Sequence, residues 1–367
     1  MKFPKDQYFV KREALDLVDN TISSLKKGLG KNIAFLGYRK TGKTLLLRQF
    51  TSCTEKEVNP VYIDLNRISL SPENFSLEFI SNIMFWFLGK LFSEYQQYFN
   101  FDFLLKKIDS LNNDELKRLL KVIENELQKI KPDQKLIVTS AFNFLEEISK
   151  KKKVILCLDN FENILDLNNF TQIKDILSLI NFENKNISFV IASSAVFQLK
   201  KLLKNFEIIE IKNFDKAESE SLINKYSIKN KKDIDEIYSL TLGNPYLIKC
   251  LCERLKQVKD VKKAFSIELS KENIYRYCEE TYDYSLNRAR GQTLLRAVLK
   301  VLASMHQASL TEISKKIYRS APVTKSLLER LIEVDLISKT DKKFSFNDPI
   351  LEQWINLIFN KLEENEE

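Results

Sequence analysis

Several residue types are scarce in this chain of 367 residues. It has a single histidine, His306, and five cysteines without paired CxxC spacing, so local spacing assembles no zinc cluster. One histidine also argues against Ser/His or Cys/His nucleophilic catalysis. The apolar run at residues 79–91 is interrupted by polar residues and is shorter than the roughly 20 residues that cross a bilayer. We therefore expect no local zinc site and no membrane partner.

The amino-terminal segment lacks the continuous apolar stretch of a secretory signal, and unpaired cysteines suit a reducing compartment. These features predict a cytoplasmic location. A composition of 44% hydrophobic and 29% charged residues is typical of a globular protein, and the length suggests two or three domains. The 58 Lys and Arg exceed the 50 Asp and Glu, for a net charge of +8, which permits a polyanionic partner without requiring one.

Short apolar runs alternate with longer segments of helical periodicity in the first half of the chain. The alternation predicts an α/β fold with a parallel sheet whose strands are mostly buried on both faces. The stretch 67–150 is too long for one crossover, so we expect a helical insertion between the second and third strands. The predicted strands are 32–36, 61–65, 154–158, 187–192 and 207–211, and the predicted helices of the insertion are 75–92, 114–130 and 134–150.

A phosphate-binding motif follows the first predicted strand. Only 7 glycines occur in the chain, and two of them complete the pattern GxxxxGK[ST] between an apolar run and a helical segment. In such a loop, backbone N–H groups and the helix dipole bind phosphate, Lys43 reaches the β and γ oxygens, and Thr44 supplies a hydroxyl to Mg²⁺. The motif residues are Gly37, Tyr38, Arg39, Lys40, Thr41, Gly42, Lys43 and Thr44.

The third predicted strand ends in a carboxylate, Asp159. An apolar strand that ends in aspartate fits the Walker B position, where the carboxylate holds Mg²⁺. A strand-terminal aspartate also starts turns in many proteins. Because a phosphate loop precedes it, we favour the metal role for Asp159.

With these motifs, the chain resembles the archaeal-type P-loop ATPases that are related to the AAA+ proteins, the STAND signalling ATPases and the archaeal replication initiators. The resemblance extends over nearly the whole chain, and it implies ATP or ADP and Mg²⁺ as ligands. It also implies nucleotide contacts from Phe9, Val10, Arg12 and Pro245. Besides the two Walker motifs, the residues that carry it are Phe9, Val10, Arg12 and Glu13, then Gly243, Asn244 and Pro245, and finally Asp348, Pro349, Ile350 and Trp354.

The chain departs from this family directly after Asp159. The family places glutamate there to polarise the attacking water, whereas this chain has Asn160, with Glu162 two residues further on. Asparagine can orient water but cannot take its proton. Two interpretations of Glu162 stay open: a substitute base, or a solvated helix residue. Ser193, or else Ser194, is the candidate for a polar sensor of the γ-phosphate at the end of the fourth strand; the alternative is helix capping.

The second half of the chain is predicted to be helical and to end in a winged helix-turn-helix. Its lid would contain Gly243, Asn244 and Pro245, which a turn glycine and a helix-starting proline also explain. The predicted domains are an ATPase core at 1–212, a helical lid at 213–283, a winged helix at 284–360 and an acidic tail at 361–367. The predicted recognition helix, 323–334, carries Lys325, Glu329 and Arg330, with Arg319 just before it.

Two functions fit these motifs. The first is a Mg²⁺-dependent ATP-binding protein, a slow ATPase with an atypical Walker B motif that acts as a nucleotide-driven conformational switch. The alternative is a nucleotide-gated module that binds DNA or docks to protein with little turnover. The mixed signs of charge on helix 323–334 favour docking or a protein partner over DNA. The candidate catalytic residues are Asp159, Asn160, Glu162 and Ser193, and the candidate metal ligands are Thr44 and Asp159.

Overall fold

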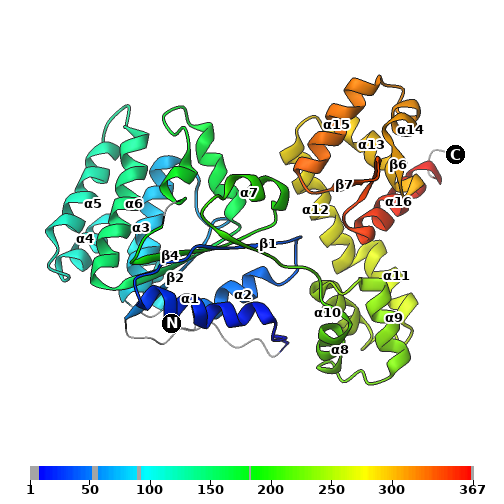
Figure 1. The fold of residues 1–367 in the computed structure, drawn as a ribbon, viewed down its shortest axis with the longest axis horizontal. Coiled ribbons are helices and arrows are strands. Elements are labelled where there is room, and N and C mark those ends of the chain that lie inside the picture. The colour runs from blue at the N-terminus through cyan, green and yellow to red at the C-terminus, as the bar shows by residue number, and fades with distance from the viewer. Residues whose placement is uncertain (1–7, 52–56, 89–91, 182, 365–367) are drawn as a thin grey trace. The chain divides into compact units, whose positions relative to one another are not determined.

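A computed structural model describes residues 8–51, 57–88, 92–181 and 183–364 (Figure 1). The chain forms two compact units, which are described separately below. The first unit contains Met1–Gly37, Gly42–Ser194 and Leu199–Ile211, and the second contains Tyr38–Thr41, Ala195–Gln198 and Lys212–Glu367. Cys53 and the last residues of the predicted acidic tail lie outside the described ranges.

A five-stranded parallel sheet forms the centre of the first unit, in the order β2-β3-β4-β1-β5. The predicted fold class is confirmed. The three middle strands are fully buried except at the first residue of β3, while the edge strand β5 is partly exposed. The strands are β1 (Ile33–Leu36), β2 (Val58–Asp64), β3 (Lys153–Asp159), β4 (Ile187–Ser193) and β5 (Glu207–Glu210).

The strand order determines which side chains meet. Since β1 pairs with both β4 and β5, and β3 lies between β2 and β4, the carboxyl ends of these strands meet at one edge of the sheet. Ligands of open parallel sheets bind at such an edge. The helices α1 (Asp16–Lys26) and α2 (Lys43–Phe50) pack on β3 and β4, preceded by η1 (Glu13–Leu15), which contacts α2.

The predicted helical insertion between the second and third strands is present. Its helices α3 and α6 contact the sheet at β2 and β3, α5 packs on α6, and α4 packs on α5, which places α4 on the outer side (Figure 1). The sequence pattern did not predict its second and third segments, η2 and α4. The insertion consists of α3 (Pro72–Leu88), η2 (Phe92–Phe99), α4 (Phe101–Asp109), α5 (Asp114–Leu127) and α6 (Gln134–Lys151).

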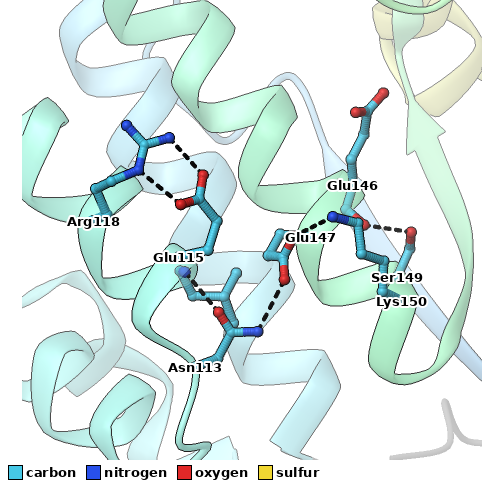
Figure 2. Close-up of polar contacts among 8 residues, drawn as sticks. Asn113, Glu115, Arg118, Glu146, Glu147, Ser149 and Lys150 are labelled. Atoms are coloured by element: carbon cyan, nitrogen blue, oxygen red, sulfur yellow. Dashed lines mark hydrogen bonds and ion pairs between the residues drawn. The ribbon is translucent and has the colours of Figure 1, made fainter.

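A polar network fastens the start of α5 to α6 (Figure 2). The side chain of Asn113 accepts a hydrogen bond from the backbone N–H of Leu116 at 2.9 Å, which caps α5, and donates one to Glu147 Oε1 at 3.1 Å. Glu147 also accepts from Lys150 at 2.5 Å. Hydrogen bonds from Lys150 and Asn113 hold the pKa of Glu147 below its ordinary value, against the opposing effect of burial. One capping residue therefore also fixes how two helices pack.

Two short 3-10 helices follow β3, η3 (Phe161–Asn169) and η4 (Ile176–Leu179), and α7 (Val196–Leu202) follows β4. Among the described residues, no helix has the length and apolar character needed to span a membrane.

The second unit is mostly helical, as predicted, and includes a small antiparallel sheet in the order β6-β8-β7. Its last part has the order of elements expected for a winged helix-turn-helix. The helices are α8 (Lys216–Asn224), α9 (Lys231–Thr241), α10 (Pro245–Arg254), α11 (Val261–Lys271), α12 (Asn273–Ala289), α13 (Gln292–Met305), α14 (Leu310–Lys316), α15 (Ala321–Glu333) and α16 (Pro349–Glu364), and the strands are β6 (Ala308–Ser309), β7 (Ile337–Thr340) and β8 (Lys343–Phe346).

Helix α12 runs through the boundary predicted between residues 283 and 284, and α16 extends into the stretch predicted as a solvated tail. The half-buried Asp348 joins these two helices. Its carboxylate accepts a hydrogen bond from Tyr277 of α12 at 2.8 Å and caps α16 through the backbone N–H of Ile350 at 2.9 Å. The domain boundaries themselves stay predictions.

Candidate functional site

The two glycines of the phosphate-loop motif serve different purposes. At Gly37, a Cβ atom would lie 2.1 Å from the carbonyl oxygen of Ile211, so the close packing of the chain after β5 requires glycine. At Gly42, φ is +98° and a Cβ atom would meet nothing within 4 Å. Gly42 is therefore needed for its left-handed backbone conformation, and the space beside it is open, as a site for phosphate requires.

The turn between β1 and α2 is held by its own polar groups. Thr41 is fully buried, and its hydroxyl donates a hydrogen bond to the carbonyl oxygen of Tyr38 at 3.0 Å. Lys40 adopts a left-handed conformation with φ of 62°, and Arg39 precedes it in the same turn. The backbone N–H of Leu46 donates to the carbonyl of Gly42, which starts α2. Hydrogen bonds within the loop therefore hold its conformation.

Lys43 spans this loop from its carboxyl side. Its side chain is buried, and Nζ donates a hydrogen bond to the carbonyl oxygen of Gly37 at 2.8 Å. A buried ammonium group requires polar or charged partners. The lysine therefore holds a positive charge over the turn, where the motif predicts phosphate oxygens.

Asp159 ends β3, with 3% of its surface exposed. Oδ2 accepts a hydrogen bond from the hydroxyl of Tyr62 at 2.8 Å, Oδ1 accepts one from the backbone N–H of Asn160 at 3.1 Å, and the Thr44 hydroxyl also hydrogen-bonds to the carboxylate. Burial raises the pKa of Asp159 above its ordinary value, although these hydrogen bonds lower it in part.

The predicted metal ligands, Thr44 and Asp159, therefore lie side by side at the carboxyl edge of the sheet. A carboxylate and a hydroxyl are both hard oxygen donors, and Mg²⁺ in nucleotide sites is held by one or two such groups together with phosphate oxygens. The residues present fit Mg²⁺.

The side chain of Asn160 contacts the neighbouring strand β2. Its backbone is left-handed, with φ of 53° and ψ of 46°, a conformation that asparagine adopts more readily than most residues. Its side-chain nitrogen donates to Asp64 Oδ1 at 2.8 Å. The amide group that could orient water is thus engaged with β2.

Glu162 is buried, with 2% of its surface exposed. Oε2 accepts hydrogen bonds from the Ser193 hydroxyl and from the backbone N–H of Ser194 at 3.3 Å, and Oε1 accepts one from the Ser194 hydroxyl at 2.6 Å. Burial raises its pKa, but the hydrogen bonds and the positive charge of Lys43 outweigh burial and hold the pKa of Glu162 below its ordinary value. The interpretation of Glu162 as a solvated helix residue is wrong, since the left-handed turn at Asn160 directs it inward.

The structure thus brings together most of the candidate residues of the first unit. Ser193 and Ser194, at the end of β4, both bind Glu162, and Glu162 is near enough to Lys43 for their charges to interact. Phe9, Val10 and Arg12 precede η1, which contacts α2; Val10 is buried. Their contact with a nucleotide stays a prediction.

Pro245 lies in the second unit and has a local structural role. Asn244 caps α10 through the backbone N–H groups of Tyr246 at 3.0 Å and Leu247 at 3.3 Å, and Pro245 occupies the first turn. Gly243 has φ of 73°, and a Cβ atom there would lie 2.0 Å from the carbonyl oxygen of Phe214. These contacts account for all three residues, and the nucleotide contact of Pro245 stays a prediction.

Sequence reasoning missed two residues of this site, Tyr62 and Asp64. Tyr62 and Asp64 are two residues apart on β2 and so lie on the same face of the sheet. Asp64 is in register with Asp159. The second carboxylate at the end of a predicted strand was a usable signal, because parallel strands end at a common edge.

The basic residues on and just before the predicted recognition helix have partners within the protein. The Arg330 guanidinium donates two hydrogen bonds to the carbonyl oxygen of Ala289, at 2.9 Å and 2.6 Å, at the end of α12. Lys325 forms an exposed ion pair with Glu329 at 3.7 Å. Arg319 donates to the carbonyl oxygen of Tyr318.

No protein-family model and no curated protein sequence matches the chain. Among solved structures, a Walker-type ATPase of Pyrococcus abyssi is similar, with a TM-score of 0.66 at 17% identity over 97% of this chain and 98% of that one. The Drosophila ORC bound to DNA aligns with a TM-score of 0.46 at 10% identity over 95% and 87% of the chains. A STAND protein of Pyrococcus horikoshii aligns with a TM-score of 0.41 at 16% identity over 97% and 43%. The first comparison confirms the resemblance to archaeal P-loop ATPases at the level of the fold.

Proposed function

We propose that the protein binds ATP and ADP with Mg²⁺ and hydrolyses ATP slowly, as a nucleotide-driven conformational switch. The observation that carries this proposal is the meeting of Lys43, Thr44, Asp159 and Glu162 at the carboxyl edge of the sheet. All except Thr44 are buried charged groups with polar partners. Burying so many charges is costly for folding alone, whereas a triphosphate and its metal ion would use them together.

In this proposal Lys43 and the turn at 37–42 bind the β and γ phosphates, and Thr44 and Asp159 hold Mg²⁺. The metal ion would neutralise charge on the phosphate oxygens when bound. Glu162 accepts the proton of the water that attacks the γ phosphorus, and ADP and phosphate are the products. The lowered pKa of Glu162 keeps its carboxylate ionised and able to accept that proton.

The same hydrogen bonds explain why turnover would be slow. Both oxygens of Glu162 accept hydrogen bonds from Ser193 and Ser194, so a water molecule has to compete with these hydroxyls for the carboxylate. Asn160 is engaged with Asp64 at 2.8 Å. Ser193 would then report the state of the γ-phosphate through Glu162.

The experiment is phosphate release by the wild-type protein with ATP and Mg²⁺, compared with Glu162→Gln and Lys43→Ala. Loss of one general base lowers a rate by about 10²–10⁴-fold, so Glu162→Gln should release phosphate at the background rate of Lys43→Ala but still bind ATP. Glu126→Gln is a matched control, because Glu126 is also a buried glutamate of the first unit but lies in the insertion. Equal turnover in Glu162→Gln and wild type would contradict the assignment of the base.

The alternative is a nucleotide-gated module that binds a protein or DNA without turnover. It is favoured if wild-type phosphate release does not exceed that of Lys43→Ala while ATP still binds. The partners of Arg330 and Lys325 within the chain support a protein partner over DNA. Salt-dependent binding of duplex DNA would instead support a DNA partner. The logarithm of the association constant would fall with the logarithm of the salt concentration, with a slope of about −0.9 per phosphate contact, and Lys325→Glu would weaken binding.

A further inference from the structure

Tyr62 connects strand β2 to the Walker B carboxylate. It is opposite Cys157 in the register of β2 with β3, two residues before the pair formed by Asp64 and Asp159. Its long side chain extends along the sheet, so that its hydroxyl donates a hydrogen bond to Asp159 Oδ2 at 2.8 Å. Only 9% of the surface of Tyr62 is exposed.

Helix α2 covers this contact from the other side. Thr44 and Arg48 are one helical turn apart and therefore lie on the same face of α2. Thr44 hydrogen-bonds to Asp159, and the Arg48 guanidinium lies 5.9 Å from the centre of the Tyr62 ring. The ring is therefore held between the helix that carries one metal ligand and the strand that carries the other.

Both oxygens of Asp159 accept hydrogen bonds. Tyr62 holds Oδ2 directly. Oδ1 accepts from the backbone N–H of Asn160 at 3.1 Å, and the Asn160 side chain is itself held by Asp64 at 2.8 Å. The torsion of the carboxylate is thus fixed by Tyr62 of the neighbouring strand and by the backbone of Asn160.

We propose that Tyr62 is a positioning residue, whose hydroxyl sets the orientation in which Asp159 and Thr44 accept Mg²⁺. The proposal rests on the proposed function of this site. Partners of metal ligands orient the ligand, and their loss typically lowers metal affinity by about 10-fold to 100-fold. Nucleotide contacts from the phosphate loop do not depend on the Tyr62 hydroxyl, so metal-free binding should be insensitive to it.

The test titrates Mg²⁺ against the binding of a fluorescent ADP analogue to the whole chain. Tyr62→Phe should raise the Mg²⁺ concentration at half-maximal binding, the Mg²⁺ midpoint, about tenfold. Its affinity for the ADP analogue in EDTA should equal that of the wild type, and its melting temperature without ligand should equal that of the control variant. The matched control is Tyr95→Phe, which also removes a tyrosine hydrogen bond in the first unit, at 2.9 Å to Asn82 in the insertion. Tyr95→Phe should keep the wild-type midpoint.

The outcomes separate this proposal from the function on which it rests. If the wild-type protein shows no Mg²⁺-dependent binding, the proposed function fails. If the wild type binds and Lys43→Ala does not, but Tyr62→Phe keeps the wild-type Mg²⁺ midpoint, the positioning role alone is overturned. It is also overturned if Tyr62→Phe loses affinity equally with and without Mg²⁺, because the hydroxyl would then support the fold and not the metal ligand.

Discussion

The carboxyl edge of the sheet and the α14–α15 pair both contain basic side chains that the sequence presents as candidates for binding a polyanion. In the first region Lys43 and Asp159 are buried and belong to a connected set of hydrogen bonds. In the second, Lys325 and Arg319 are exposed, and their partners are one or four residues away in sequence.

The difference follows from the cost of burying charge. A buried charge has to be paired or to serve a ligand, so motif spacing at the sheet edge predicts geometry closely. An exposed ion pair contributes little, about 0–1 kcal/mol, so charge on a surface helix specifies neither a structure nor a partner. Substitutions in the two regions test this contrast.

Replacement of Lys43 by alanine should have the largest effect. The variant loses the buried ammonium group of the phosphate loop, so the rise in melting temperature with ADP and Mg²⁺ should largely disappear. A ligand at 100 times its dissociation constant stabilises a protein by about 2.7 kcal/mol. Thermal unfolding with and without nucleotide measures this stabilisation by the ligand.

Lys153→Ala is the matched control for that measurement. Lys153 Nζ also donates to backbone carbonyl oxygens, those of Leu25 at 2.8 Å and Lys26 at 2.7 Å, at the amino end of β3. This variant should lose stability without losing the nucleotide-dependent shift. A full shift in Lys43→Ala would remove the phosphate-loop assignment.

Replacement of Asn160 by glutamate should destabilise the protein and leave phosphate release no faster. Glutamate would place a second carboxylate against Asp64, lose the hydrogen bond at 2.8 Å, and adopt a left-handed backbone at a cost of about 1–2 kcal/mol. We expect a total loss of about 2–3 kcal/mol in the free energy of unfolding, measured by urea denaturation.

Asn160→Gly isolates the loss of the hydrogen bond, since glycine tolerates φ of 53° but lacks the amide. In this variant the free energy of unfolding should fall only by the contribution of the hydrogen bond to Asp64. Faster phosphate release by Asn160→Glu would show that a base at this position reaches the reacting water, against the geometry described above.

Arg330→Ala should have a smaller effect, on the stability of the second unit. It removes two hydrogen bonds to the carbonyl oxygen of Ala289, and we expect a loss of about 1–3 kcal/mol in the free energy of unfolding. Lys325→Ala, on the same helix, removes only an exposed ion pair and should change it by less than about 0.5 kcal/mol. Equal effects of the two variants would contradict the contrast between partnered and exposed charges.

The sequence predicted much of the fold because its strands are apolar and its helices are periodic. The five strands, the insertion and the phosphate loop all follow from local patterns. The segments η2 and α4 were missed because they are short, with 8 and 9 residues, and the two-residue strand β6 is too short to leave a pattern.

The parts of the site that the sequence did not predict depend on strand order and register. Tyr62 reaches Asp159 only because β2 pairs with β3 in one register, which no local pattern specifies. The burial of Glu162 depends on the left-handed turn at Asn160 and on Ser193 from β4. The motif therefore identified Thr44 and Asp159, while their supporting residues required the three-dimensional arrangement.

The most direct test of the account is the Mg²⁺ dependence of ADP binding in Asp159→Ala, measured by calorimetry with Mg²⁺ and with EDTA. The account predicts that the affinity gained from Mg²⁺ in the wild type is lost in this variant, while its metal-free affinity is retained, because Asp159 and Thr44 hold the metal and Lys43 holds the phosphates. Equal losses with and without Mg²⁺ would contradict it and make Asp159 a structural residue.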